Sequence, residues 1–183
     1  MEQVTIRSET RADIDAIAAV TVAAFATLAI SNQTEHYIIA ALRAADALTL
    51  SLVAEADGRL VGHIAFSPVT ISDGTPDWYG LGPVSVLPAY HRQGIGSALI
   101  RAGLARLPAL GARGCCLVGH PAYYGRFGFQ HSHELGVAGV PEEAFFALAF
   151  TGQLPRGTVA FHTAFALDAP HTGADAASPR ACA

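Results

Sequence analysis

The feature that most restricts the fold of this chain is a strand that runs into a glycine turn and then into a helix. Residues 84–87, which are apolar except for Ser85, precede a polar loop, and Gly94 and Gly96 open a helical pattern that continues to Leu107. The first amide groups of a helix have no acceptor within it, and the helix dipole places partial positive charge at that end. The segment therefore predicts an anion site, and a phosphate group is its natural occupant.

Two known glycine motifs do not describe this turn. The dinucleotide-binding fingerprint needs a third glycine where Leu99 stands, and the P-loop ends in Gly-Lys followed by Ser or Thr, which is absent here. Glycine at 94 and 96 permits a positive φ or a close approach of a ligand to the backbone, and it equally permits tight packing. The turn alone leaves both interpretations open.

The sequence before this turn predicts strands and helices in a mixed α/β order. Residues 4–7 alternate as in a strand, and Thr10 with Asp13 resembles the opening of a helix that continues to about position 27. A second helix is predicted over 34–45. Its apolar face consists of Tyr37, Ile38, Ala41 and Leu42.

Apolar runs predict the sheet. Residues 48–56 and 59–71, joined by an Asp-Gly dipeptide, indicate an antiparallel hairpin, and 79–87 indicates a bulged strand because glycine and proline interrupt it. A short strand is expected at 115–118. The pattern then predicts one or two helical turns at 121–127, closing strands from 129 and at 157–166, and a helix that begins near Pro141.

Composition restricts the class of protein. A chain of 183 residues with 51% hydrophobic and 14% charged residues predicts one globular domain, which we place at 1–167, with a frayed tail at 168–183. The net charge of −4 and the absence of a basic run argue against a nucleic-acid or anionic-membrane partner. The uncharged run at 16–30 is shorter than the roughly 20 residues that cross a bilayer.

Cysteine use and the N-terminus predict a cytoplasmic location. Cys115, Cys116 and Cys182 do not form the spaced framework of a secreted disulfide protein, and no basic segment leads into an apolar one at the N-terminus. For Cys115 and Cys116, a role as nucleophile is less favoured than a role as small residues on a buried strand. His131 and His133 lack a third ligand at a suitable spacing, so no metal site is expected.

A second motif gives the glycine turn its context. Residues 119–129 read Gly-His-Pro-Ala-Tyr-Tyr-Gly-Arg-Phe-Gly-Phe. Together with the turn, this segment resembles the GNAT (GCN5-related N-acetyltransferase) superfamily, and in particular a bacterial subgroup with a Gly-His-Pro-x-Tyr-Tyr-x-Arg-Phe-Gly-Phe segment. The resemblance covers about 4–165. It implies an α/β fold with a splayed, mostly antiparallel central sheet flanked by helices.

The resemblance also implies acetyl-CoA as the acyl donor. The strand at 84–86 would pair with the pantetheine arm, and the turn at 92–97 would hold the pyrophosphate. The residues implied in cofactor binding are Val84, Ser85, Val86, His91, Arg92, Gln93, Gly94, Ile95, Gly96 and Ser97. His91 departs from the Gln or Arg usual at its position, which backbone binding of the phosphates should tolerate.

For catalysis, the resemblance implies direct attack of an amine on the thioester, with Tyr124 as general acid for the departing sulfur. The alternative for Tyr124 is a place in an aromatic core. His120 is either a base, a cofactor contact or a structural residue at a strand end. The expected strands carry no acid, so the general base is left open among Glu55, His63, Asp77, His120 and a water molecule.

Three hypotheses follow for the whole chain. The leading one is an acetyl-CoA-dependent N-acetyltransferase that acts on a primary amine of a small molecule, amino acid or peptide. The second is a non-catalytic acyl-CoA-binding module, which the missing acid keeps open. The third is a self-associating structural protein, for which a weakened glycine turn would be expected. A homodimer is implied by the family alone.

Overall fold

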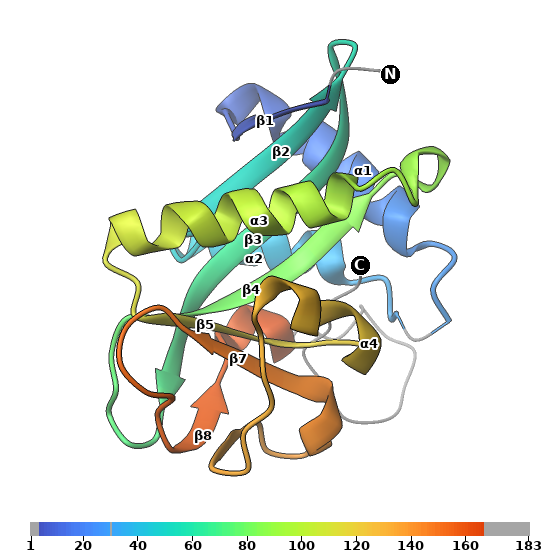
Figure 1. Cartoon of the computed structure of the whole chain (residues 1–183). Helices are drawn as coiled ribbons and strands as arrows, with labels where there is room; N and C mark the ends of the chain where they lie inside the picture. Colours follow the sequence, from blue (N-terminus) through green and yellow to red (C-terminus); the bar gives the residue numbers. More distant parts are fainter. Residues whose placement is uncertain (1–3, 30, 167–183) are drawn as a thin grey trace.

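A mixed β-sheet runs through the molecule (Figure 1). The computed structural model describes residues 4–29 and 31–166. The main path of the sheet has the order β1, β2, β3, β4, β5, β7, and β8 pairs with both β3 and β6. The strands are β1 (Val4–Ser8), β2 (Leu50–Ala56), β3 (Arg59–Ile71), β4 (Trp78–Val86), β5 (Gly114–Val118), β6 (Leu135–Gly136), β7 (Phe145–Ala149) and β8 (Gly157–Ala160). Along the main path only β4 and β5 are parallel, so the predicted mixed, mostly antiparallel sheet is confirmed.

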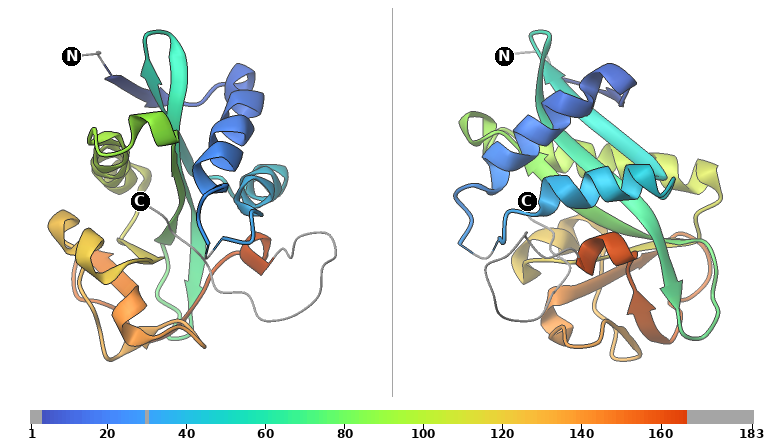
Figure 2. Two further views of the ribbon diagram at one scale, coloured as in Figure 1. Left: turned by 90° about the vertical axis from the view of Figure 1, so that its right-hand side faces the viewer. Right: turned by 180° about the vertical axis from the view of Figure 1, so that it is seen from behind.

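Helices cover both faces of this sheet. The α1 (Ile14–Phe25) and α2 (Glu35–Ala44) helices lie on one face, and α3 (Ile95–Arg106) lies on the other (Figure 2). The short α4 helix (Pro121–Tyr124) follows β5. Short 3₁₀ turns lie at Arg11–Asp13, Pro88–Tyr90, Leu107–Leu110, Gly125–Phe127, Glu142–Ala144 and Thr163–Ala166. Because the sheet is buried on both faces, its central strands read as nearly continuous apolar runs.

Two local predictions are confirmed. The Asp13 carboxylate accepts hydrogen bonds from the backbone N–H of Thr10 at 2.7 Å and from its hydroxyl at 2.9 Å, and the turn that starts there leads directly into α1. Asp57 and Gly58 have φ values of 49° and 74° and join β2 to β3 as a tight hairpin. Both outcomes rest on short-range backbone chemistry.

The β4 and β5 strands pair over a short length only. Trp78–Gly80 of β4 pairs with Gly114–Cys116 of β5, and the pairing ends there. On its other side, β4 shifts register against β3 between Ile64 and Phe66, where the predicted bulge lies. Beyond Gly80 the two strands separate (Figure 1), which leaves the C-terminal half of β4 next to α3 and α4 rather than next to β5.

The predicted apolar face of α2 is partly wrong. Its buried residues are Glu35, Ile38, Ile39 and Leu42. Tyr37 is 48% exposed and stacks on His36, with ring centroids 3.9 Å apart. Glu35 is buried instead, and its Oε1 accepts a hydrogen bond from the Ser31 hydroxyl at 2.7 Å.

The C-terminal part also differs from the prediction. The helix expected from Pro141 is a single 3₁₀ turn at Glu142–Ala144. It ends because the following residues form β7, whose backbone pairs with β5 along its whole length. The strand expected from 129 is reduced to β6 and one isolated bridge between Gln130 and Ala147. The predicted frayed tail at 168–183 lies outside the described residues.

Candidate functional site

The start of α3 presents backbone amides to a cavity. Gly94 precedes the helix with φ 81°, a left-handed conformation that favours glycine. The first bond of the helix runs from the Ala98 amide to the Gly94 carbonyl at 2.9 Å, so the amides of residues 95–97 come before it. Within the described part of the chain no side chain caps this helix. These amides therefore remain available to an anion.

The cavity has a volume of about 520 Å³ and lies where α1, β4, the turn before α3 and α4 meet. Its lining residues are Ala24, Phe25, Leu28, Val84, Val86, Tyr90, His91, Arg92, Gly94, Ile95, Gly96, Ser97, Tyr123 and Arg126. A Cβ at Gly96 would stand 3.6 Å from the Tyr123 hydroxyl and 3.7 Å from a methyl group of Val86. Glycine thus keeps open the space directly in front of the amides.

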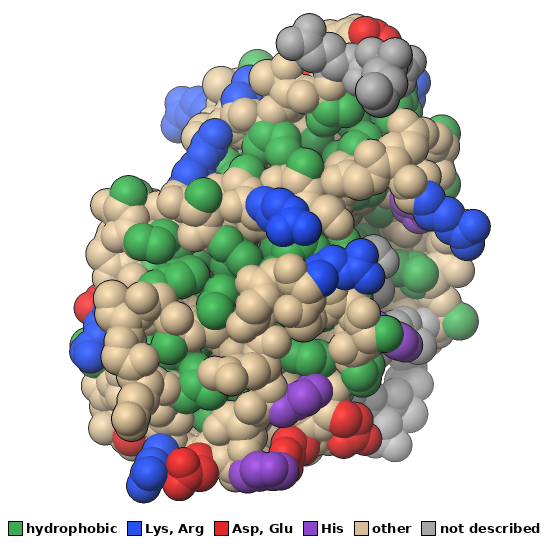
Figure 3. Space-filling view, viewed as in Figure 1, with side chains coloured by type: hydrophobic (Ala, Val, Ile, Leu, Met, Phe, Trp, Pro, Cys, Tyr) green, Lys and Arg blue, Asp and Glu red, His purple; other side chains and the backbone are tan. Residues whose placement is uncertain are grey.

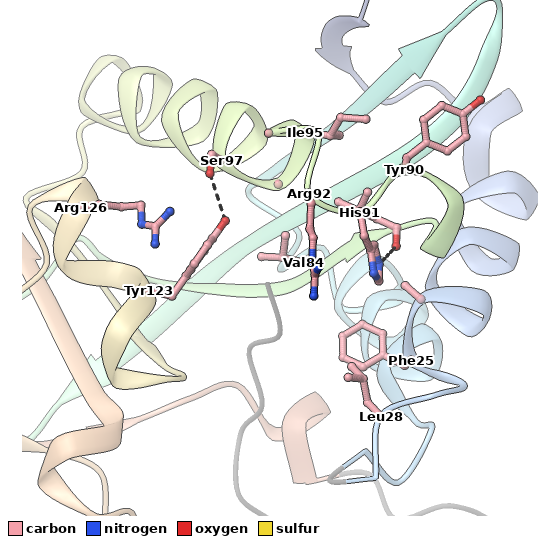
Figure 4. A pocket seen from close by; sticks show the side chains of 14 residues that line it. Phe25, Leu28, Val84, Tyr90, His91, Arg92, Ile95, Ser97, Tyr123 and Arg126 are labelled. Atoms are coloured by element: carbon pink, nitrogen blue, oxygen red, sulfur yellow. Dashed lines mark hydrogen bonds between the residues drawn. The ribbon is translucent and has the colours of Figure 1, made fainter.

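Cationic and hydroxyl groups stand on two sides of this space. Figure 4 shows Tyr123 and Arg126 on the α4 side and His91 with Arg92 on the side of α1. The Tyr123 and Ser97 hydroxyl oxygens are 3.2 Å apart, and the Arg126 guanidinium lies 4.7 Å from the centre of the Tyr123 ring. Figure 3 shows basic side chains near the centre and right of this face and others at its upper left and lower left, and acidic side chains at its margins. The charge around the amides suits a phosphorylated ligand.

The comparisons with known proteins agree with this geometry. Residues 17–129 match the model of the "Acetyltransferase (GNAT) family". The chain belongs to the GNAT acetyltransferase family. Its resemblance to that family, read from the sequence, is thereby confirmed.

Two solved GNAT structures cover most of the chain. One is a GNAT acetyltransferase from Brucella melitensis in complex with acetyl-CoA, 53% identical, with a TM-score of 0.80 over 90% of this chain and 99% of that one. The other is Escherichia coli YhbS in complex with CoA, 30% identical, with a TM-score of 0.83 over 91% and 94%. The splayed fold implied by the sequence is therefore that of GNAT proteins.

Curated relatives share a shorter segment. The protein named "Uncharacterized N-acetyltransferase YhbS" from E. coli K12 is 37% identical over 100 residues, which are 54% of this chain and 60% of that protein. "Uncharacterized N-acetyltransferase YjhQ" from the same strain is 39% identical over 83 residues, 44% of this chain and 46% of that protein. The aligned segment thus spans less than two thirds of either relative.

The structure brings most of the GNAT cofactor residues implied by the sequence to the cavity. Eight of the ten line it: Val84, Val86, His91, Arg92, Gly94, Ile95, Gly96 and Ser97. Ser85 faces α1 instead, where its hydroxyl donates to the Thr21 hydroxyl at 3.1 Å. Gln93 is exposed and donates to the Ala89 carbonyl at 3.2 Å. Alternation along β4 explains Ser85, since neighbouring side chains point to opposite faces.

Tyr124 lies outside the cavity lining, in the aromatic core. It is 1% exposed, and its ring lies edge-on to that of Tyr123 with centroids 5.1 Å apart. Phe129 and Phe146 pack against it, and a Cβ on Gly119 would overlap it. The tyrosine that faces the cavity is the neighbouring Tyr123.

His120 caps α4. Its side chain is exposed, and Nδ1 accepts the hydrogen bond of the Ala122 amide at 3.3 Å. It does not line the cavity. Its position at the end of β5 thus matches the structural role that the sequence left open for it.

The other candidate bases also lie away from the cavity. Glu55 forms an ion pair with Arg7 at 2.9 Å, and Asp77 sits in the turn before β4, where its carbonyl accepts from the Arg113 amide at 2.8 Å. His63 is completely buried on β3. Burial raises the pKa of both Cys115 and Cys116, so these thiols stay neutral and are poor nucleophiles.

Sequence reasoning missed the residues that α1 and the turn after it contribute to the cavity lining. Ala24, Phe25 and Leu28 read as ordinary apolar residues of a buried helix, and no local signal separates them from the core. Arg126 could have been found, because it stands within the motif segment at 119–129. In the described ranges, no group of three His, Cys, Asp or Glu could hold a metal ion, and no helix is long and apolar enough to cross a membrane.

Proposed function

We propose that this chain is an acetyl-CoA-dependent N-acetyltransferase that moves an acetyl group to a primary amine of a small molecule, amino acid or peptide. The observation that carries the proposal is the set of uncapped amides at the start of α3, which open into the cavity with cations beside them. The 53% identity to the Brucella protein, whose structure is a complex with acetyl-CoA, supports the same ligand here.

The residues present fit that cofactor. The amides of residues 95–97 and the Ser97 hydroxyl would hold the diphosphate, with Arg92 and Arg126 balancing its charge. The backbone of Val84 and Val86, on the part of β4 that no longer pairs with β5, would bind the pantetheine arm. When bound, the cofactor supplies an activated acetyl group. We propose that the hydroxyl group of Tyr124, whose ring packs edge-on against that of Tyr123, donates a proton to the leaving sulfur.

A second candidate function is a non-catalytic acyl-CoA-binding module. The observation that favours it is that no carboxylate lines the cavity among the residues described. Both candidates share the cofactor site and differ only in whether an amine is acetylated.

We propose that residues 1–167 act as one acetyltransferase domain and that the protein is cytoplasmic and forms a homodimer. The two buried free thiols of β5 are compatible with a reducing compartment.

The cofactor site is tested by titrating CoA calorimetrically into the wild type and two glycine variants. Gly94→Ala and Gly111→Ala place a Cβ at nearly equal φ values, 81° and 87°, where nothing lies within 4 Å. Each should cost about 1–2 kcal/mol of stability through backbone strain. Only Gly94→Ala should weaken CoA binding, by about tenfold or more, because one lost charge-assisted hydrogen bond is worth roughly 1.5–3 kcal/mol.

Two outcomes would contradict the proposal. If CoA does not bind the wild type at millimolar concentration, both candidate functions fail. If Gly94→Ala and Gly111→Ala bind CoA equally, the amides of α3 are not the phosphate site. Release of free thiol from acetyl-CoA with a panel of amines then separates the enzyme from the binding module.

A further inference from the structure

One side chain in the cavity wall is an imidazole, the group that most often serves as a general base in enzymes. The titratable residues of the described lining are Tyr90, His91, Arg92, Tyr123 and Arg126. Tyrosine and arginine hold their protons far above pH 7, whereas the imidazole of histidine changes charge close to it. His91 is therefore the candidate base that the cavity itself offers.

A main-chain hydrogen bond fixes the orientation of His91. Its Nε2 lies 2.9 Å from the carbonyl oxygen of Val86, the last residue of β4. A carbonyl only accepts, so Nε2 carries the proton and the lone pair of the neutral ring is on Nδ1. Protonation of Nδ1 leaves this bond intact, because both nitrogens of the imidazolium are donors. The ring can therefore take up and release a proton without turning.

His120 has the opposite arrangement. Its Nδ1 accepts the Ala122 amide, so that lone pair is already used and the proton of the neutral ring is on Nε2. Taking up a proton on Nδ1 would break the cap of α4. Of the two histidines in the motif segments, only His91 combines a free basic nitrogen with a place in the cavity.

We propose that Nδ1 of His91 is the general base that removes a proton from the attacking amine, directly or through one water molecule. This inference rests on the proposed transferase function. When an ammonium ion is acetylated, its nitrogen loses two protons. The electrons of the first N–H bond stay on nitrogen as the lone pair that attacks the thioester carbonyl. A C–N bond then replaces the C–S bond. One proton reaches the sulfur and the other, held by His91, passes to water.

The surroundings of His91 suit this exchange. Figure 4 shows it on the side of the cavity next to Phe25, away from Tyr123 and Arg126. The lining that comes from α1 and the turn after it is apolar and consists of Ala24, Phe25 and Leu28. Tyr90 and Arg92 are the titratable groups of the turn that carries His91, and Tyr123 with Arg126 line the cavity from the α4 side. His91 itself is exposed at the rim, so its proton can leave to solvent.

The test replaces His91 by glutamine. Glutamine can still donate an N–H to the Val86 carbonyl, but it cannot accept a proton. His91→Gln should keep CoA affinity within about threefold while turnover falls about 100-fold or more, the usual scale for a lost general base. The acid limb of the pH profile of kcat/KM should disappear. In the wild type the midpoint of that limb should coincide with the titration of the His91 ring followed by NMR.

The matched control is His131→Gln. His131 is also an exposed imidazole bonded to main-chain carbonyls, those of Glu142 and Phe145, but it lies outside the cavity lining. Its turnover should equal that of the wild type. An unchanged turnover of His91→Gln, or a loss of CoA affinity that accounts for the whole loss of turnover, would overturn the proposal. A wild type that binds no CoA would refute the transferase function instead, so the two failures are distinguishable.

Discussion

Two groups of polar side chains lie in different parts of the molecule, and each contains a histidine. On the face of α1 and α2, Arg43 binds Glu9 at 2.9 Å, and the Ser51 hydroxyl donates to the same carboxylate and accepts from Nε2 of His63, 2.8 Å away. We call these four residues the polar cluster. In the cavity, the polar side chains turn instead toward open space.

The difference shows how burial decides the role of a polar residue. Burial lowers the pKa of His63, which keeps the imidazole neutral, and Nδ1 has no hydrogen-bond partner among the described residues. Burial alone would raise the pKa of Glu9, but His63, Arg43 and Ser51 together lower it to about 2. Glu9 is bonded by Arg43 and Ser51, and Ser51 is bonded by His63, so the loss of one of these partners should cost stability. Loss of a cavity residue should cost ligand binding or turnover.

The largest effect on stability is expected from Arg43→Met. Side-chain exposure is 24% for Arg43 and 19% for Glu9, so the variant leaves a mostly buried carboxylate without its cation. This should lower the free energy of unfolding by about 3 kcal/mol. The melting temperature should fall by roughly 6–12 °C. Urea unfolding at pH 7 measures the first quantity, and CoA affinity should not change.

Arg156→Met is the control for that prediction. Arg156 pairs with Glu134 at the surface, where their side chains are 74% and 60% exposed, and its loss should change stability by less than about 0.5 kcal/mol. Equal effects of the two variants would mean that the polar cluster behaves as an ordinary surface ion pair.

Two neighbouring tyrosines offer the next comparison. Tyr124→Phe should lower turnover by about 10- to 100-fold at nearly constant CoA affinity, because it removes the proposed acid. Tyr123→Phe removes the contact with Ser97 and should weaken CoA binding severalfold with less effect on turnover. Steady-state kinetics and calorimetry measure both, and melting temperatures control for loss of core packing. The reverse pattern would assign the acid to Tyr123, the tyrosine that faces the cavity.

Sequence alone predicted the parts of the site that are encoded locally. The amides at the start of α3 follow from Gly94 and the helical pattern after it, and eight of the ten expected cofactor residues line one cavity. Such features depend on backbone geometry within a few residues. The hairpin turn at Asp57 and Gly58 is of the same kind.

Long-range packing explains what the sequence did not reveal. Which tyrosine of the pair faces the cavity depends on packing with distant residues, because Phe129 and Phe146 hold Tyr124 in the core, and no local pattern contains those contacts. The acidic pair that follows Pro141 resembles a helix start, but pairing of β7 with β5 ends that helix after one turn. Likewise, apolar periodicity predicts that α1 is buried, but it does not tell that Phe25 and, just after the helix, Leu28 line the cavity.

The smallest effect concerns pH and again contrasts the two histidine sites. The folded-state pKa of His63 lies below its ordinary value of 6.5, so between these values the unfolded chain binds one more proton. Stability is therefore complete above pH 6.5 and falls on acidification, by no more than about 1.4 kcal/mol per pH unit. Below pH 4.5, protonation of Glu9 lowers the stability further until the pH reaches its folded-state pKa of about 2. The hydrogen bonds from Arg7 also lower the pKa of Asp13, so protonation of Asp13 acts in the same direction.

Urea unfolding at several pH values separates the contributions. His63→Gln cannot take up a proton, so its stability should be flat between pH 7 and 5 and should still fall below pH 4.5. His131→Gln, which changes an exposed imidazole, should keep the slope of the wild type throughout. If the stability of His63→Gln falls between pH 7 and 5 as steeply as that of the wild type, the buried imidazole does not cause this fall. The expected difference between the buried histidine of the polar cluster and the exposed histidines is then absent.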